Sequence, residues 1–417
     1  MDWRSSILLS ILFVFGPHSA FGDWSGWRGS DRDGVVSAGK AWPDSLDEKN
    51  LELVWSAPLS EGYSAPVTAD GRVFTFETSK KESEVIRAFD LESGNPLWDL
   101  SWTGSMKVPF FAAKNGSWVR STPTVNGGAI YAGGMRDVLV KVDAATGEEM
   151  WRIDFTERES TEVPAFGQVC SPLFDGGFLY VQAGLAVAKL DAETGETLWR
   201  AMEDRRAMFG SAFSSPVIAT LGGRRQLVVQ GRLELAGLDL ETGTQLWNIP
   251  VKAFRGMNIL TPTVVGNDRI FTASYGGGAF LFEVGRGDDG GLAVEQVWNN
   301  PKLEGYMGNP AFIDGHIYLH GRDKRLHCID LADGGAKWST GEEFGEYWSM
   351  IRNQGRILAL DQGGELILFD ASPEEFRLLD RRVISTDEST WAHVGFDGNR
   401  VLVRSLKSVS VFRWSAE

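Results

Sequence analysis

The chain has 417 residues, of which 43% are hydrophobic, and a formal net charge of −15. A polyanion repels phosphate backbones and anionic membrane surfaces, so this charge excludes nucleic acid as a partner. Only 2 residues are cysteines, which excludes a disulfide framework, whereas 49 glycines and 16 tryptophans favour an all-β fold with many tight turns and large buried aromatic rings.

Residues 1–22 have the features of a secretory signal peptide. Arg4 precedes a short apolar run from Ile7 to Phe15, and Ala20-Phe21-Gly22 resembles a small-x-small cleavage site. The run is shorter than the roughly 20 apolar residues that span a bilayer, and no cysteine follows it that would carry a lipid anchor. We therefore expect an exported protein, periplasmic or extracellular, that is soluble, without a transmembrane segment and not lipid-anchored. The alternative is an uncleaved N-terminal strand.

A nine-residue pattern, Asp-x-x-x-Gly-x-x-x-Trp, recurs along the chain. It begins at Asp90, Asp143, Asp191, Asp239 and, in a weaker copy, Asp330. An Asp side chain accepts hydrogen bonds from the amides of a turn, and Gly tolerates the positive φ that such turns need. The pattern therefore predicts a β-hairpin in which the Trp begins the next strand. Its recurrence about every 40 to 53 residues predicts a propeller or a β-solenoid.

A second marker precedes each hairpin and completes a four-stranded unit. It is a small residue, Pro or its substitute, and an apolar run, as in Ser64-Ala-Pro66 and Ser121-Thr-Pro123. Pro is tolerated at the start of a strand, where no ladder donor is lost. Six units carry both markers, although the fifth has a divergent hairpin that ends at Trp298. A seventh unit has Leu378 at the Trp position.

The two ends of the repeat array complement each other. The eighth unit, residues 391–414, lacks an outer strand, and residues 51–55 form a separate strand with its own Trp55. Pairing of these segments would close the ring and remove free sheet edges. We therefore predict an all-β, eight-bladed β-propeller with four-stranded antiparallel blades, closed by the N-terminal strand joining the last blade.

The repeated hairpin resembles the tryptophan-docking motif of propellers with pyrroloquinoline quinone (PQQ)-like repeats. This family includes quinoprotein alcohol dehydrogenases and BamB-like proteins, and the resemblance covers residues 51–417. It implies that each Trp docks against the neighbouring blade, which assigns this structural role to Trp55, Trp98, Trp151, Trp199, Trp247, Trp298 and Trp338. Residues 23–50 contain Trp27-Arg28-Gly29 and are similar to the Trp-Arg-Gly leader of exported members. We expect them to pack along the ring as an extension.

The resemblance also sets out what an enzyme of this family would need. Quinoprotein enzymes use adjacent cysteines, a calcium site of carboxylates and amides, and an Asp base beside an Arg. Here Cys170 and Cys328 are far apart in sequence and belong to different blades, and His316, His320 and His327 are separated by the predicted strands. We therefore predict no catalytic residues, no metal site and no cofactor, and we favour a protein that is not an enzyme. Only the alternative, a quinoprotein oxidoreductase, would bind PQQ with Ca²⁺.

The best candidate for a binding site is the mouth of the central channel. One residue just before or at each first strand should face it: Tyr63, Arg120, Gln168, Phe213, Asn258, Met307, Trp348 and Trp391. Two enlarged loops, residues 102–118 and 155–169, add Phe110, Phe111 and Phe166. These aromatic side chains form either a plug over the channel or a binding surface.

Three functions remain open at this point. The first is an exported, non-catalytic binding or scaffold module of the cell envelope, which binds an envelope protein or a small ligand at the channel mouth. The second is a PQQ-dependent oxidoreductase, and the third is a secreted adhesion or glycan-binding module. The absence of adjacent cysteines favours the first over the second. The sequence does not indicate an oligomeric state.

Overall fold

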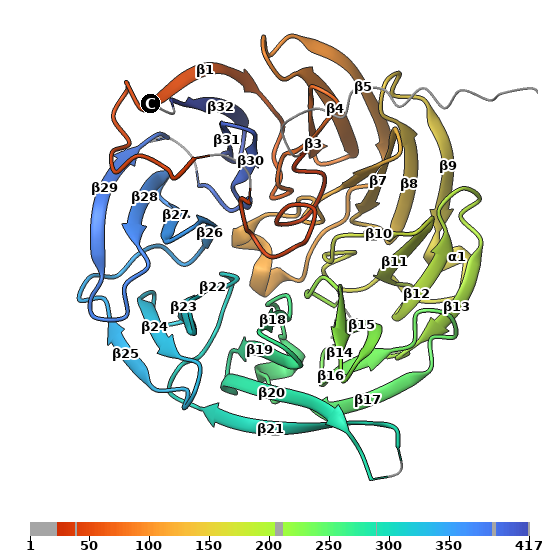
Figure 1. The fold of residues 1–417 in the computed structure, drawn as a ribbon. Coiled ribbons are helices and arrows are strands. Elements are labelled where there is room, and N and C mark those ends of the chain that lie inside the picture. Colours follow the sequence, from red (N-terminus) through yellow and green to blue (C-terminus); the bar gives the residue numbers. More distant parts are fainter. Residues whose placement is uncertain (1–22, 38–39, 205–211, 289, 386–388, 416–417) are drawn as a thin grey trace, which may run out of the picture.

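Eight four-stranded antiparallel sheets surround a central channel (Figure 1). The computed structural model describes residues 23–37, 40–204, 212–288, 290–385 and 389–415. The predicted eight-bladed propeller is therefore confirmed. The predicted signal peptide, residues 1–22, lies outside the described residues.

Within the first seven blades the strands follow each other in sequence from the channel outwards (Figure 1). Blades one to three contain β2 (Val67–Ala69), β3 (Arg72–Ser79), β4 (Ser83–Asp90) and β5 (Pro96–Thr103); β6 (Thr124–Asn126), β7 (Ala129–Gly134), β8 (Val138–Asp143) and β9 (Glu149–Asp154); β10 (Leu173–Asp175), β11 (Phe178–Ala183), β12 (Ala186–Asp191) and β13 (Thr197–Ala201). Blades four and five contain β14 (Val217–Leu221), β15 (Arg224–Gln230), β16 (Glu234–Leu238) and β17 (Gln245–Pro250); β18 (Thr263–Val265), β19 (Arg269–Ser274), β20 (Gly278–Arg286) and β21 (Leu292–Asn300). Blades six and seven contain β22 (Ala311–Ile313), β23 (His316–His320), β24 (Leu326–Asp330) and β25 (Ala336–Ser339); β26 (Trp348–Asn353), β27 (Arg356–Asp361), β28 (Glu365–Asp370) and β29 (Arg377–Val383).

The eighth blade closes the ring as the sequence predicts. It contains β30 (Gly395–Asp397), β31 (Arg400–Arg404) and β32 (Ser408–Trp414), and its outer strand is β1 (Leu51–Pro58) from the other end of the chain. β1 and β32 are antiparallel, with Leu51 opposite Trp414 and Pro58 opposite Ser408. Hydrogen bonding between the two ends therefore makes the propeller one closed unit.

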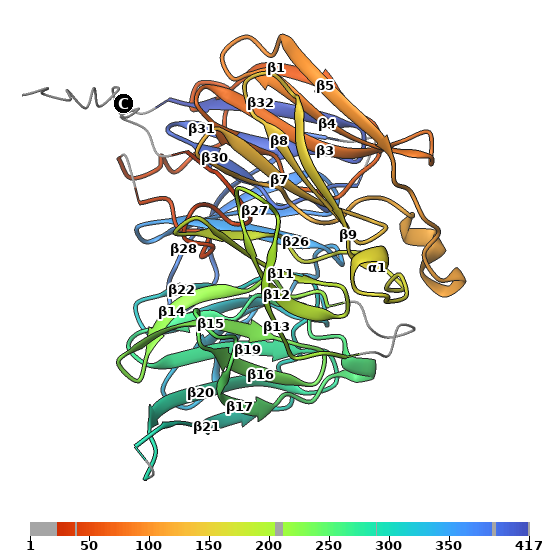
Figure 2. The same ribbon diagram turned by 90° about the vertical axis from the view of Figure 1, so that its right-hand side faces the viewer.

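Helix is confined to short turns in the loops of the described part of the chain. These are the 3₁₀ helices η1 (Phe110–Asn115) and η3 (Phe254–Gly256) and the helix α1 (Phe155–Arg158). Figure 2 shows α1 and the loop that carries η1 on one face of the ring. None of the described helices is long and apolar enough to cross a membrane.

The repeated Asp closes its hairpin through hydrogen bonds to the turn. In blade two, Asp143 Oδ1 accepts from the backbone N–H of Ala145 at 2.9 Å and of Thr146 at 2.8 Å, and from the Thr146 hydroxyl at 3.0 Å. The hydrogen bonds from Thr146 lower the pKa of Asp143. Gly147 then adopts φ = 78°, a conformation that suits Gly. Asp191 and Asp239 accept the same three types of hydrogen bond in blades three and four.

The repeated Trp side chains lie at the interfaces between blades. In six of the seven predicted positions, the indole N–H donates to a backbone oxygen of the following blade: Trp55 to Leu91, Trp98 to Ala144, Trp151 to Ala192, Trp199 to Leu240, Trp298 to Leu331 and Trp338 to Ser372. Trp247 differs, because its N–H donates to Gln226 Oε1 in its own blade while its ring packs with residues of blade five. The usual acceptor would come from the hairpin of blade five, and this hairpin is the one that diverges from the repeated sequence pattern.

Close packing against a Trp ring is a second reason why the repeated hairpin position is Gly. A Cβ on Gly94, Gly147, Gly243 or Gly334 would lie 2.5–2.7 Å from the indole ring of the preceding blade's Trp. The ring therefore packs directly on the Gly backbone, and the two repeated residues are complementary across the blade interface.

Residues 24–36, which we call the leader plug, occupy the channel instead of packing along the ring as expected (Figure 1). Their main chain bonds to three blades. The Trp24 N–H donates to Thr68 Oγ1 at 2.9 Å, Ser25 O accepts from the Val125 N–H at 2.7 Å, and the Val36 N–H donates to Arg352 O at 2.8 Å. For these residues the expectation failed, because the inward-facing carbonyl groups that attract the segment exist only in the assembled ring. Residues 42–50 do pack on the ring: the Leu46 N–H donates to Asp380 Oδ2 on β29 at 2.6 Å, and Trp42 packs with residues of blades seven and eight.

Three side chains of the leader plug reach the remaining five blades. Arg32 donates to Ser171 O at 3.2 Å, to Pro172 O and to Pro216 O at 2.8 Å, and Arg28 donates to Pro310 O at 2.8 Å. The Trp27 N–H donates to Thr261 Oγ1 at 3.0 Å, and its ring meets His393 edge-on at 5.2 Å. Burial lowers the pKa of Arg28 to about 10 and of Arg32 to about 9, which leaves both cationic at neutral pH.

Candidate functional site

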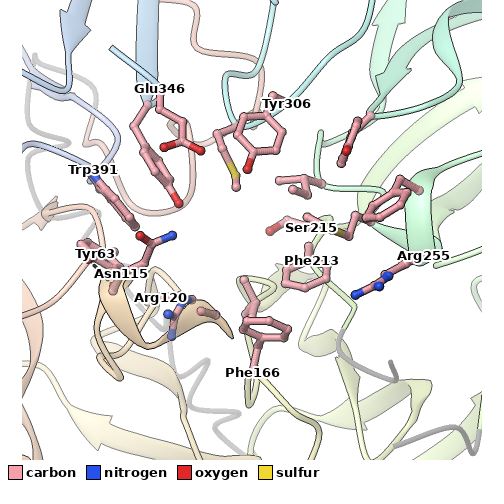
Figure 3. A pocket seen from close by; sticks show the side chains of 18 of the residues that line it. Tyr63, Asn115, Arg120, Phe166, Phe213, Ser215, Arg255, Tyr306, Glu346 and Trp391 are labelled. Carbon is pink, nitrogen blue, oxygen red and sulfur yellow. Dashed lines mark hydrogen bonds between the residues drawn. The ribbon is translucent and has the colours of Figure 1, made fainter. Parts of the chain in front are cut away.

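One end of the channel contains a cavity of about 430 Å³ between the leader plug and the loops that enter the first strands (Figure 3). Every blade contributes lining residues from the segment just before its first strand. Trp27 of the leader plug lines it as well. Ten of the 22 lining residues are aromatic: Trp27, Tyr63, Phe111, Phe166, Phe213, Phe254, Tyr275, Tyr306, Tyr347 and Trp391.

Five of the eight predicted mouth residues line the cavity. These are Tyr63, Arg120, Phe213, Met307 and Trp391. The other three lie outside it: Gln168 and Asn258 are buried, and Trp348 is buried and stacks on His320 with ring centroids 5.1 Å apart. The Asn258 amide donates to the carbonyl oxygens of Gly231 and Arg232.

The three misplaced predictions have a common cause. Their sequence neighbours Val169, Met257, Ile259 and Tyr347 line the cavity in their place. Consecutive side chains of an extended segment point in opposite directions, so a shift of one residue exchanges a cavity residue for a buried one. The sequence signal that would have identified Tyr347 is this alternation beside Trp348. Trp27, Tyr275, Tyr306 and Glu346 were missed because their positions depend on the assembled ring.

A stack of three aromatic rings forms one wall. Trp391 lies between Tyr63 and Tyr347, with centroid distances of 4.3 Å and 3.4 Å and interplanar angles of 22° and 15°. The Tyr63 hydroxyl donates to Asn115 O at 2.5 Å, which ties the stack to η1. Burial raises the pKa of both tyrosines, so their hydroxyls remain protonated. This wall supplies aromatic surface against which another ring can pack.

The charged side chains around the cavity are mostly cationic. Arg120 donates to Trp118 O at 2.8 Å and to Gly116 O at 2.9 Å, and burial lowers its pKa. Arg255 lies over the Phe254 ring at 5.1 Å, and Lys114 is exposed at the end of η1. Across from them, burial and then the nearby Glu346 carboxylate raise the pKa of Tyr306 to about 12. Figure 3 shows Arg120 and Arg255 on opposite sides of Phe166 and Phe213.

The enlarged loops leave the cavity open. Phe110 is 91% exposed and Phe111 55% exposed, so neither packs as a plug over the channel. Ring contacts nevertheless connect them to the cavity. Phe110 and Phe111 are 5.7 Å apart, Phe111 and Phe166 are 6.3 Å apart, and Phe166 and Phe213 are 5.4 Å apart. These four side chains, which we call the phenylalanine track, run from the exposed rim into the cavity.

The cavity residues do not fit a calcium-bound quinone. Calcium takes six to eight oxygen ligands, commonly from several carboxylates. The only lining carboxylate among the described residues is Glu346, and those residues contain no cluster of three or more His, Cys, Asp or Glu side chains that could hold a metal. Cys170 and Cys328 are both buried free thiols, in blades three and six. Cys170 interacts with Gln182 rather than with another thiol.

A family model supports what the repeats and the ring indicate. The model described as outer membrane protein assembly factor BamB matches residues 81–340, which is more than half of the chain. The chain therefore belongs to this family of PQQ-like propellers.

Curated relatives and solved structures resemble parts or all of the ring. Tetrathionate hydrolase of Acidithiobacillus ferrooxidans is 28% identical over 33% of this chain and 28% of its own length. The 1-butanol dehydrogenase (cytochrome c) of Thauera butanivorans is 31% identical over 32% of this chain and 19% of its own length. The chain thus spans less than a third of each relative.

Two solved structures show the same fold at low sequence identity. BamB from Moraxella catarrhalis superposes with a TM-score of 0.64 at 17% identity, covering 87% of this chain and 99% of that one. A europium-containing methanol dehydrogenase gives a TM-score of 0.52 at 11% identity, covering 94% of this chain and 98% of that one. At these identities the likeness concerns the fold and leaves the activity open.

Proposed function

We propose that this chain is an exported, non-catalytic binding module of the cell envelope and that the cavity at the channel end is its binding site. The observation that carries the proposal is the aromatic cavity at the channel end, with Trp27 on one side and loops from every blade around it. Concave, mainly apolar sites with a few polar groups are typical of ligand binding. The family description as an outer membrane assembly factor supports a location in the envelope and a protein partner there.

The alternative is a PQQ-dependent oxidoreductase, which the partial similarity to 1-butanol dehydrogenase favours. The donor set of the cavity argues against it, because Glu346 is the single carboxylate among the described lining residues and the two cysteines are in different blades. That set does not supply the six to eight oxygen ligands, commonly from several carboxylates, that calcium takes.

The experiment that decides between the two is a calorimetric titration of the purified protein with PQQ. The titration is run with and without Ca²⁺, because PQQ is a flat tricarboxylate that a cationic aromatic cavity attracts by itself. The binding-module proposal predicts no saturable heat that requires Ca²⁺. Binding at micromolar or lower concentration that appears only with Ca²⁺ would favour the oxidoreductase.

A further inference from the structure

The charge of the cavity is opposite to that of the protein. The chain carries a net charge of −15, yet Lys114, Arg120 and Arg255 line the cavity with one carboxylate, Glu346, among its described lining residues. No ion pair joins any of the three cations to a described carboxylate. A local cationic site on a polyanion attracts negatively charged groups and repels positively charged ones.

The apolar surface continues beyond the cavity. The phenylalanine track joins the exposed Phe110 to Phe213 through successive ring contacts of 5.4–6.3 Å. Phe110 is 91% exposed, so the outer end of the track is available to an occupant. A ligand confined to about 430 Å³ would leave this end uncovered. The combined surface therefore suits an extended chain better than a small molecule.

From these observations we propose that the site binds an acidic, aromatic segment of a partner protein, in extended conformation. This inference rests on the proposed binding function. An aromatic side chain of the segment enters the cavity and stacks beside the ring stack of Tyr63, Trp391 and Tyr347. Carboxylates on either side of it pair with Arg255 and Arg120, and the rest of the segment covers the phenylalanine track.

The two arginines differ in what they offer. An Arg side chain has five N–H donors. Arg120 uses donors on the carbonyl oxygens of Trp118 and Gly116 and contacts Met135 Sδ at 3.6 Å, which fixes its orientation and leaves the others for a ligand. Arg255 is exposed, and its described neighbour is the Phe254 ring. Arg120 therefore provides a preorganised contact and Arg255 an adaptable one.

The test uses three acetylated, amidated hexapeptides in calorimetric titrations of the whole protein. SEFDFS carries acids and rings, SKFKFS keeps the rings and reverses the charge, and SEADAS keeps the charge without rings. We expect saturable binding of SEFDFS that weakens as salt concentration rises. Binding of the other two should be at least about tenfold weaker, because each lacks one of the two features that the site recognises.

Matched variants connect this binding to the cavity. Arg255→Gln should weaken SEFDFS binding about two- to fivefold, as expected for an exposed ion pair, whereas Arg286→Gln, on the exposed blade-five hairpin, should leave it unchanged. Phe111→Ser should also weaken binding, and Leu97→Ser is its control, because Leu97 is similarly exposed (48%) on the outer strand β5. Unchanged melting temperatures establish that all four variants are folded.

Equal binding of SEFDFS and SKFKFS, or no binding of SEFDFS, would overturn the inference. Either result is independent of the PQQ titration. If SEFDFS does not bind and PQQ shows no Ca²⁺-dependent binding, only the proposed partner chemistry is removed. PQQ binding that requires Ca²⁺ removes the binding-module proposal itself.

Discussion

The contact between Gly243 and Trp199 gives a quantitative test of how neighbouring blades are joined. Gly243 follows the repeated Asp of blade four with φ = 72°, and Trp199 belongs to β13 of blade three. A Cβ on Gly243 would lie 2.7 Å from the indole ring. The Trp199 N–H also donates to Leu240 O at 3.2 Å. Gly243→Ala therefore introduces both backbone strain and a steric overlap.

The two effects can be separated with a matched Gly. Gly223 has nearly the same φ, 73°, but no atom lies within 4 Å of the Cβ that Gly223→Ala would add. We expect this control to lower the free energy of unfolding by about 1 kcal/mol, the cost of left-handed backbone. Gly243→Ala should cost about 2–4 kcal/mol, because overpacking adds roughly 1–3 kcal/mol.

Removing the ring should remove the overlap. Trp199→Ala alone should cost about 3 kcal/mol, the lower end for a large aromatic, because the ring is only partly buried. In that background Gly243→Ala should cost only about 1 kcal/mol, like the control. Urea unfolding of the four proteins of this double-mutant cycle gives the coupling energy. Additive effects, or equal costs for Gly243→Ala and Gly223→Ala, would refute the direct packing of ring on Gly.

Two further substitutions test the channel and a buried carboxyl group. Arg32→Ala removes the donors to Ser171, Pro172 and Pro216 and should lower the free energy of unfolding by about 2–3 kcal/mol; an unchanged melting temperature would show that the leader plug does not hold these blades together. Burial raises the pKa of the Glu84 carboxyl from 4.5 to about 7, so the native state binds this proton more tightly than the unfolded state does. The protonated carboxyl therefore stabilises the native state fully below pH 4.5, and this stabilisation is lost as the pH rises through 7. Glu84→Gln removes this titration and should flatten the difference in unfolding free energy between pH 5 and pH 8; parallel curves for variant and parent would contradict it.

The sequence was sufficient for the ring because its information is local and repeated. Each Asp-to-Trp hairpin fixes its own turn, as the three hydrogen bonds to Asp143 illustrate. The eight four-stranded units then form a closed ring once the N-terminal strand completes the last one. The pairing of β1 with β32 follows from the same count. Trp247 is the one docking Trp whose N–H bonds within its own blade, and the hairpin it faces, in blade five, departs from the repeated sequence pattern.

The site was only partly predictable because its residues meet through the assembled ring. A one-residue change of direction separates Tyr347, which lines the cavity, from Trp348, which is buried. The position of Trp27 depends on Thr261 and His393, residues more than two hundred positions away in sequence. No periodicity within residues 23–50 indicates that Arg28 and Arg32 are buried in the channel.

The central claim is that the cavity binds a partner and not a redox cofactor. The most direct test is calorimetric titration of the purified protein with PQQ, with and without Ca²⁺, alongside the Trp391→Ala variant. The binding-module account predicts no saturable heat that requires Ca²⁺ and no Ca²⁺-dependent change in melting temperature with PQQ. Binding at micromolar or lower concentration that appears only with Ca²⁺ and is lost in Trp391→Ala would contradict it and would place a quinone in the cavity.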